Sequence, residues 1–298
     1  MATAQFTRLI SGLSFTECPR WRNGRLYVSD FYTHRVLAIA RDGTAELIAH
    51  VPQQPSGLGF LPDGRLLIVS MRDRKLLRRE HDGSLTLHAD LSRLAPWHLN
   101  DMLVDHDGRA WVGNFGFDLM GGAPACPTVL ICVEPDGRAR IAAGELGFPN
   151  GMVLTPDGHT LIVAETTMNR LSAFTVSGSS LGPRRTWASF GEPPSSTDVT
   201  ALLAQAVVVP DGICLDADGA VWVADPIHTR LIRVAEGGRI LDEFPTGTLG
   251  VFACMLGGDD GHTLFACAAA TFHEAELTRN HQAAILMTRV PVPHAGLP

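Results

Sequence analysis

The sequence predicts an all-β fold: a six-bladed β-propeller with four-stranded blades, closed by the N-terminal strand. The first observation is a repeated Asn-Gly or Asp-Gly turn, followed each time by a short apolar strand. The second is the spacing of these turns, which is 40, 44, 50, 61 and 42 residues. A period near forty with short strands and glycine-containing turns is typical of propeller blades. The turns begin at Asn23, Asp63, Asp107, Asp157, Asp218 and Asp260.

The strands of each repeat follow from its turns. The apolar segments directly after the turns are LYVSD, LLIVS, AWVGN, LIVAE, VWVAD and LFACA. In four repeats a further strand comes next and ends in a second tight turn, over 34–43, 128–137, 169–178 and 229–238. The repeats run through the chain without a linker, so we expect one propeller domain over residues 1–298.

The two ends of the chain predict how the ring closes. The last repeat finishes with the strand-like AAILMTRVPV, and QFTRLISGL precedes the first repeat. An open ring would leave unpaired strand edges on its first and last blades. We therefore expect the N-terminal segment to form the outer strand of the last blade.

Composition limits the function classes. The net charge is −7 and basic residues form no block, which argues against a nucleic-acid partner. No apolar run reaches the roughly 18 residues of a membrane span, and MATAQFTRL does not resemble a signal peptide. The six cysteines show no CxxC or zinc spacing, so we expect them to be reduced and mostly buried. These features predict a cytoplasmic protein, either a monomer or a weak homo-oligomer.

Two insertions interrupt the period. One, at 115–127, is rich in glycine and proline, and the other spans about 190–207 with a short helix expected over 198–205. Long insertions in a tight repeat usually lie on one face and cover a site. The alternative, solvated loops without a function, remains open.

Four polar residues recur at nearly the same position in four of the six repeats. Each lies six or seven residues before an Asn-Gly or Asp-Gly turn, and the other two repeats carry a serine and an alanine there. Residues at one register of a closed radial repeat converge on its axis. The four are Glu17, Asn100, Asn150 and Asp211, and the small residues are Ser56 and Ala253.

Two carboxylates and two amides supply hard oxygen ligands and a charge of −2, which suits one divalent cation. Ca²⁺ is the expected ion, and Mg²⁺ and Mn²⁺ fit the same ligands. Strand length places this site at the end of the channel opposite the turns. The second strands end there too, so Asp30 and Asp225 are expected to orient the ligands. Polar groups that merely satisfy strand ends around a water-filled channel are the alternative.

The chain resembles the family of six-bladed propellers that includes gluconolactonase, regucalcin and luciferin-regenerating enzyme. The resemblance covers nearly the whole chain and rests on TECPRW, HLNDMLVDHDGRAWVGNFGF, FPNGMVLTPDGHTLIVAETTMNRLSAF, PDGICLDADGAVWVAD and FACMLGGDDGHTLF. It implies a catalytic divalent metal in the central channel, with Glu17, Asn150 and Asp211 as its main ligands. Asn100 falls where the family ligates the metal or binds substrate beside it, and the family also accommodates Zn²⁺.

The resemblance implies hydrolysis of a lactone, a cyclic ester. A cation polarises the carbonyl oxygen, and Asp211 is the candidate general base, with pure ligation as the alternative role. No G-x-S-x-G sequence is present, so a serine nucleophile has no support. A phosphotriester or fluorophosphate hydrolase using the same metal, and a non-enzymatic calcium-binding regulator, stay open as alternatives.

Substrate contacts are expected near Asn100. Family members that open sugar lactones tend to carry an arginine two residues before this asparagine, where this chain has His98. An imidazole cannot clamp hydroxyls as a guanidinium does. With Trp97 adjacent, His98 indicates a less polar ring or different sugar contacts, and it could also shuttle protons. Asp118, in the first insertion, roughly matches an acidic substrate contact of the sugar lactonases.

Overall fold

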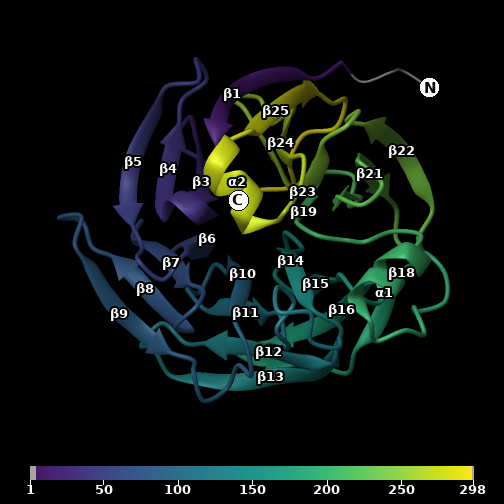
Figure 1. Ribbon diagram of the computed structural model, residues 1–298. Coiled ribbons are helices and arrows are strands. Elements are labelled where there is room, and N and C mark those ends of the chain that lie inside the picture. The colour runs from purple at the N-terminus through teal and green to yellow at the C-terminus, as the bar shows by residue number, and fades with distance from the viewer. Residues whose placement is uncertain (1–4, 297–298) are drawn as a thin grey trace.

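The computed structural model describes residues 5–296, which form six antiparallel sheets arranged as blades around a central axis (Figure 1). Each blade is built on four strands from the axis outward; blade 4 has the two-residue β17 in addition, and the last blade takes its outermost strand from the N-terminal part of the chain. The predicted six-bladed propeller with four-stranded blades is confirmed. Residues 1–4 and 297–298 of the range predicted as one domain lie outside the described residues.

The first three blades follow one another without a break. Blade 1 contains β2 (Thr16–Arg22), β3 (Arg25–Asp30), β4 (Arg35–Ile39) and β5 (Ala45–His50), with the short 3₁₀ helix η1 (Phe31–Thr33). Blade 2 contains β6 (Pro55–Phe60), β7 (Leu66–Ser70), β8 (Lys75–Arg79) and β9 (Leu85–Asp90). Blade 3 contains β10 (Leu99–Val104), β11 (Ala110–Asn114), β12 (Thr128–Val133) and β13 (Ala139–Leu146).

The last three blades carry the helices and the closure. Blade 4 contains β14 (Pro149–Leu154), β15 (Thr160–Glu165), β16 (Arg170–Ser177) and β18 (Arg185–Ser189), with β17 (Ser180–Leu181) beside β16. Blade 5 contains β19 (Ile213–Leu215), β20 (Val221–Asp225), β21 (Arg230–Val234) and β22 (Ile240–Pro245), preceded by α1 (Val199–Gln205). Blade 6 contains β23 (Gly250–Gly257), β24 (Thr263–Ala269), α2 (Glu274–Asn280), β25 (Ala283–Arg289) and β1 (Thr7–Leu13).

The N-terminal strand closes the ring as predicted. β1 is the outermost strand of blade 6 and pairs antiparallel with β25, from Thr7 opposite Met287 to Leu13 opposite Ala283. The first and last parts of the chain thus share one sheet, and β25 is not left as an open edge.

The Asp-Gly turns are stabilised locally. At the turn of blade 4, the carboxylate of Asp157 accepts a hydrogen bond from the backbone N–H of His159 at 3.0 Å. Gly158 then adopts a φ of +73°, a conformation that side chains with a Cβ rarely tolerate. Because the glycine with positive φ recurs at all six turns, the turns could be located from sequence.

The inner strands approach one another closely around the axis. The N–H of Gly212, at the entry to β19, donates to the carbonyl of Phe252 in β23 at 2.8 Å. A Cβ at Gly212 would lie 2.5 Å from the Cβ of Ala253. Glycine directly after Asp211 therefore lets blades 5 and 6 pack tightly at the channel.

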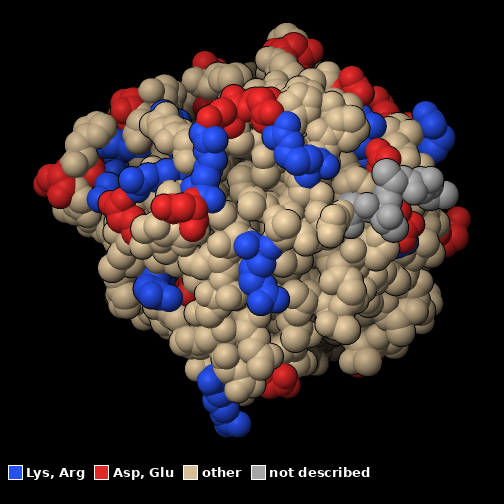
Figure 2. Space-filling model, turned by 90° about the horizontal axis from the view of Figure 1, so that it is seen from above, with Lys and Arg blue, Asp and Glu red and all other residues tan. Residues whose placement is uncertain are grey.

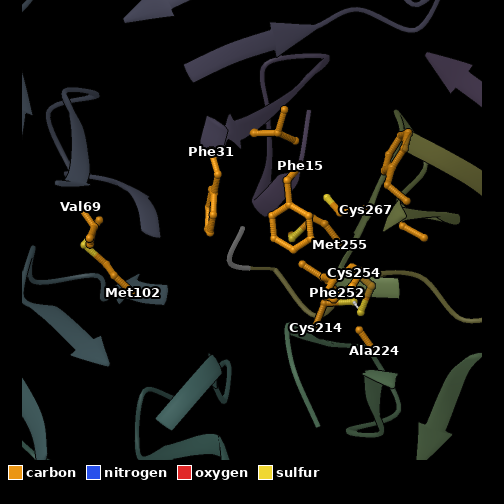
Figure 3. Close-up of a cluster of buried hydrophobic side chains, with 14 of the residues drawn as sticks. Phe15, Phe31, Val69, Met102, Cys214, Ala224, Phe252, Cys254, Met255 and Cys267 are labelled. Carbon is orange, nitrogen blue, oxygen red and sulfur yellow. Dashed lines mark hydrogen bonds between the residues drawn. The ribbon is translucent and has the colours of Figure 1, made fainter. Parts of the chain in front are cut away.

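Apolar side chains fill the space between blades. Trp111 and Trp222 are fully buried there, and Figure 3 shows Phe15, Met255 and Cys267 packed together near the axis. Of the six cysteines, all are unpaired in the structure and only Cys126 is exposed, which agrees with the predicted reduced and mostly buried thiols.

The predicted helix in the second insertion is present as α1, whose N-cap residue Asp198 accepts the N–H of Ala201 at 2.9 Å. Helix α2, between β24 and β25, was not predicted; in Figure 1 it lies over the centre of the ring.

Within residues 5–296 no helix is both long and apolar enough to cross a membrane. Figure 2 shows basic and acidic side chains next to one another, without a large patch of one sign.

Candidate active site

A cavity of about 280 Å³ opens at one end of the central channel. Glu17, Asn100, Asn150 and Asp211 all line it, so the four residues selected from the repeat register do meet at one site. They come from four different blades and lie at the ends of the inner strands opposite the Asp-Gly turns. The four side chains therefore lie together at the end of the channel opposite the turns.

Irregular strand pairing aims these side chains at the channel. The ladder between β2 and β3 shifts register between Glu17 and Arg20, and equivalent shifts follow Leu99 in β10 and Pro149 in β14. A β-bulge locally turns the strand and re-aims a side chain. At Glu17 the next residue, Cys18, takes a positive φ of 53°. The bulges thus fall where the polar residues enter the cavity.

Hydrogen bonds orient the amide of Asn150. Its Nδ2 donates to the Oγ1 of Thr166 at 3.1 Å, and that hydroxyl donates in turn to the carbonyl of Pro210 at 2.9 Å. This leaves the amide oxygen of Asn150 as the atom available to a cation. The backbone N–H of Asp211 donates to the carbonyl of Ala224 at 3.0 Å, which fixes the strand entry.

Both carboxylates of the site resist ionisation. Burial, followed by the charges of Asp211 and Asp101, raises the pKa of Glu17 well above its usual value. Burial and the charge of Asp101 likewise raise the pKa of Asp211, which the Asn150 amide and the Gly212 N–H oppose. Two buried acids that repel each other form a site that a cation would stabilise.

A buried ion pair beside these acids was missed from sequence. The Nη2 of Arg20 in β2 donates to the Oδ1 of Asp101 in β10 at 2.9 Å, with both side chains 6% exposed. The same nitrogen donates to the carbonyl of Met102 at 2.5 Å. The pair joins blade 1 to blade 3, and these two strands carry Glu17 and Asn100. Both residues sit in the motifs used for the site, but their pairing depends on ring geometry.

The donor set fits one divalent cation. Arg20 offsets the charge of Asp101, so Glu17 and Asp211 retain a charge of −2 when both are ionised. Within residues 5–296 no group of three or more His, Cys, Asp or Glu side chains could hold a metal ion. A cation here would therefore depend on the amide oxygens of Asn100 and Asn150 as well as the carboxylates. Oxygen-only ligation favours Ca²⁺ or Mg²⁺ over softer metals.

The acidic residues at the ends of the second strands bind backbone atoms rather than the ligand side chains. The Oδ1 of Asp30 accepts the N–H of Phe15 at 3.0 Å, and the Oδ1 of Asp225 accepts the N–H of Val209 at 3.1 Å. Glu165 binds the segment before Asn150 in the same way. Asp30 and Asp225 were expected to orient the ligands, and each carboxylate anchors the backbone two residues before Glu17 or Asp211.

Comparison with known proteins identifies the family. The sequence profile described as "SMP-30/Gluconolactonase/LRE-like region" matches residues 15–270. The chain belongs to this family. It is 26% identical to the 6-deoxy-6-sulfogluconolactonase of Pseudomonas putida, covering 95% of this chain and 93% of that protein. It is 25% identical to the pentonolactonase XacC of Haloferax volcanii, covering 72% of this chain and 67% of that protein.

Solved structures of similar fold include the regucalcin of Agrobacterium tumefaciens, with a TM-score of 0.80 at 20% identity. That match covers 100% of this chain and 99% of the other. A gluconolactonase of Xanthomonas campestris gives a TM-score of 0.74 at 23% identity, covering 97% of this chain and 90% of the other. At these identities the structures support the propeller fold alone.

Besides Asn100, three residues were predicted to contact the substrate, and one of them lines the cavity. His98 lines it, and burial lowers its pKa, which favours the neutral ring. Trp97 is not part of the cavity wall but stacks on the His98 ring at 5.0 Å. Asp118 also lies outside the wall, where its carboxylate accepts the N–H of Gly121 at 2.8 Å. Its charge acts on His98 from there.

Side chains from insertions surround the cavity mouth. Leu119 and Met120 of the first insertion and Val199 and Leu203 of the second line it, so both predicted insertions contribute to the site. From α2, the carboxylate of Glu274 accepts two hydrogen bonds from Arg72 at 2.8 and 2.9 Å. This pair joins blade 2 to blade 6 across the mouth, and the repeat pattern of the sequence did not predict it.

Proposed function

We propose that the protein is a metal-dependent lactonase, with one divalent cation, Ca²⁺ by preference, held by Glu17, Asn100, Asn150 and Asp211. The observation that carries this proposal is the pair of buried, mutually repelling carboxylates at the base of a cavity. Relatives named as lactonases over most of this chain's length support the same reaction class.

The proposed reaction opens the ester ring with water. When bound, a divalent cation supplies a Lewis acid that stabilises negative charge on the carbonyl oxygen. Asp211 accepts a proton from the attacking water, and burial favours this step because it strengthens the carboxylate as a base. Water adds to the carbonyl carbon, the ring C–O bond breaks, and the leaving oxygen is protonated to give a hydroxy acid.

Asn100 and His98 are the proposed direct substrate contacts. Both line the cavity, and the amide of Asn100 can donate a hydrogen bond to a substrate oxygen. We assign Trp97 and Asp118 an indirect part: Trp97 fixes the His98 ring by stacking, and Asp118 supplies a nearby negative charge. A neutral His98 can accept or donate a proton at pH 7.

The decisive experiment is acid release from a panel of lactones, using protein stripped with a chelator and then resupplied with Ca²⁺, Mg²⁺, Mn²⁺ or Zn²⁺. Turnover that disappears on stripping and returns with one ion would support a metal-dependent lactonase. Folded protein that binds a cation but opens no lactone would contradict it. Phosphotriesters and fluorophosphates assayed in parallel would then distinguish the hydrolase alternative from a calcium-binding role.

A further inference from the structure

The cavity wall is strongly enriched in aromatic side chains. The chain has thirteen phenylalanines and two tyrosines, and seven of these fifteen line this one cavity. Ligand pockets are usually lined by apolar and aromatic groups with a few placed polar ones, and the apolar part sets which ligand surface is buried. The arrangement of the rings therefore carries information about the substrate.

One group of rings comes from blades 1 and 6. Phe15 packs edge-on against Phe252, with ring centroids 4.7 Å apart, and against Phe31 at 5.4 Å. Figure 3 shows Phe15 and Phe31 close to each other at the axis side of blade 1. The hydroxyl of Tyr32 donates to the carbonyl of Phe272 at 2.6 Å, so Tyr32 presents its ring rather than a free hydroxyl.

A second group comes from blades 3 and 4. Phe115 follows β11 and Phe148 precedes β14, and their ring centroids lie 4.5 Å apart. His98 extends this group, with its ring 6.4 Å from Phe115. In a ring of six, blades 3 and 4 stand opposite blades 6 and 1. The cavity thus lies between two aromatic walls.

Several polar side chains of the wall already have protein partners. Arg72 donates to the Oε1 of Gln54 at 2.7 Å and binds both carboxylate oxygens of Glu274, so the only guanidinium of the described cavity wall is neutralised. Thr166 is engaged with Asn150 and Pro210. Between the two aromatic walls, away from Asn100, His98 and the two carboxylates, a ligand rich in hydroxyls would lose hydration and regain few hydrogen bonds, which is costly.

We propose that the substrate is a neutral lactone with an apolar substituent, an alkyl chain or an aryl ring, seated between the two aromatic walls. This inference rests on the proposed function and adds the substrate class. The ester group lies at the base near Glu17 and Asp211, where the polar atoms are concentrated. The substituent lies between Phe15 and Phe31 on one side and Phe115 and Phe148 on the other. Sugar lactones should be poor substrates, because their hydroxyls would lose hydration between the aromatic walls.

The test compares kcat/KM of metal-supplied protein for δ-valerolactone, δ-hexalactone, δ-octalactone, δ-decalactone, a 6-phenyl δ-lactone and glucono-δ-lactone. Burial of each methylene should raise kcat/KM about two- to fourfold, so δ-decalactone should exceed δ-valerolactone by at least about thirtyfold. Glucono-δ-lactone should fall below δ-valerolactone. A flat chain-length series, or a preference for glucono-δ-lactone, would overturn the substrate class while leaving the lactonase function intact.

Variants locate the effect in the walls. Phe115→Ala and Phe148→Ala should each lower the ratio of kcat/KM for δ-decalactone over δ-valerolactone at least about fivefold, and the leucine variants should lower it less. Phe60→Ala is the matched control, because Phe60 packs on Tyr27 at 5.0 Å outside this cavity. An unchanged ratio in folded Phe115 and Phe148 variants would remove these walls from substrate binding.

Binding of unreactive analogues tests the apolar substrate class independently of the proposed lactonase reaction. Neutral δ-lactams with the same 6-alkyl series should bind with a Kd that falls as the chain lengthens, measured by calorimetry on the same protein. If no lactone is turned over but the lactams show this trend, the proposed reaction fails and the apolar ring ligand stands. If the lactams show no chain-length dependence, the apolar substrate class is rejected whatever the turnover.

Discussion

At the scale of single residues, Asp211 combines burial with a place in the cavity. Asp211→Asn keeps the size and hydrogen-bonding shape of the side chain but removes its charge and its ability to accept a proton at neutral pH. We expect lactone turnover to fall by about 10²- to 10⁴-fold, the usual contribution of a general base. Cation affinity should fall as well, and circular dichroism should be unchanged.

Asp218→Asn is the matched control for that variant, because Asp218 lies on the exposed turn of the same blade. Its turnover should stay within about twofold of the unmodified protein. Full turnover by the Asp211→Asn protein would eliminate Asp211 both as base and as an essential ligand.

Glu17 allows a test of the site without any substrate. Because its pKa is raised in the fold, its contribution to stability is full below the unfolded pKa of about 4 and is lost as pH rises through the folded pKa. Metal-free protein should therefore lose Tm between pH 5 and pH 8. Glu17→Gln removes that titration and relieves the repulsion on Asp211, so its metal-free Tm at pH 8 should be higher by at least about 2 °C, roughly 1 kcal/mol.

With calcium present, the unmodified protein should have a higher Tm at pH 8 than Glu17→Gln. The unmodified protein gains Tm from the cation by mass action, and Glu17→Gln should gain less because one of two ligand charges is gone. Glu192→Gln, an exposed loop substitution, should behave as the unmodified protein does. A Glu17→Gln protein with a lower metal-free Tm at pH 8 and an undiminished calcium response would place Glu17 outside a cation site.

The four register residues could be predicted from sequence because each lies six or seven residues before a turn that sequence identifies directly. Arg20 and Asp101 lie in the same motifs, but their ion pair spans blades 1 and 3 and depends on how the ring closes. Arg72 and Glu274 are 202 residues apart, and Arg72 follows β7 while Glu274 begins α2, so neither lies in a repeated strand. Long-range pairs of this kind have no local signal.

At the scale of elements, buried carboxylates at the ends of the second strands of blades 1, 4 and 5 bind the entry of the inner strand of the same blade. Asp225, at the end of β20, is fully buried and accepts hydrogen bonds from Val209 N–H, from His228 Nδ1 at 2.9 Å and from Arg230 Nε at 2.9 Å. Sequence predicted where these acids lie but not what they bind, since their partners include backbone atoms of incoming loops as well as side chains.

Asp225→Ala should therefore affect stability and turnover together. Removing one partner of a buried ion pair costs about 3–5 kcal/mol of unfolding free energy, because Arg230 and the Val209 N–H lose their acceptor. Turnover by the folded fraction should also fall, because the segment leading to Asp211 is released. Chemical denaturation and kcat at a temperature well below the transition measure the two effects separately.

Two further variants serve as controls for the effects of Asp225→Ala on stability and on kcat. Asp225→Asn still accepts the Val209 N–H and should recover part of kcat while remaining less stable. Asp242→Ala removes a partly exposed partner of Arg233 in the same blade and should cost at most about 1 kcal/mol without changing kcat. If Asp225→Ala lost stability but kept full kcat, Asp225 would have no part in positioning Asp211.

At the scale of the whole molecule, the ring brings together residues from six blades, so the site depends on closure. Glu17 lies in blade 1, which packs beside blade 6, and blade 6 is completed by β1 from the other end of the chain. The aromatic wall of Phe15 and Phe252 spans this same junction. Closure and the geometry of the cavity are consequently coupled.

Deleting residues 1–13 removes β1, exposes the edge of β25 and uncovers the core beneath Leu13, which is 4% exposed. We expect Tm to fall by at least about 10 °C, since several kcal/mol of apolar contact and strand pairing are lost. The exposed edge should also promote association, which light scattering would detect. A synthetic peptide of residues 5–13 should restore part of the Tm, and a peptide of the same composition in scrambled order should not. A truncated protein with unchanged Tm and turnover would mean that the six inner strands hold the ring and its site without the closing strand.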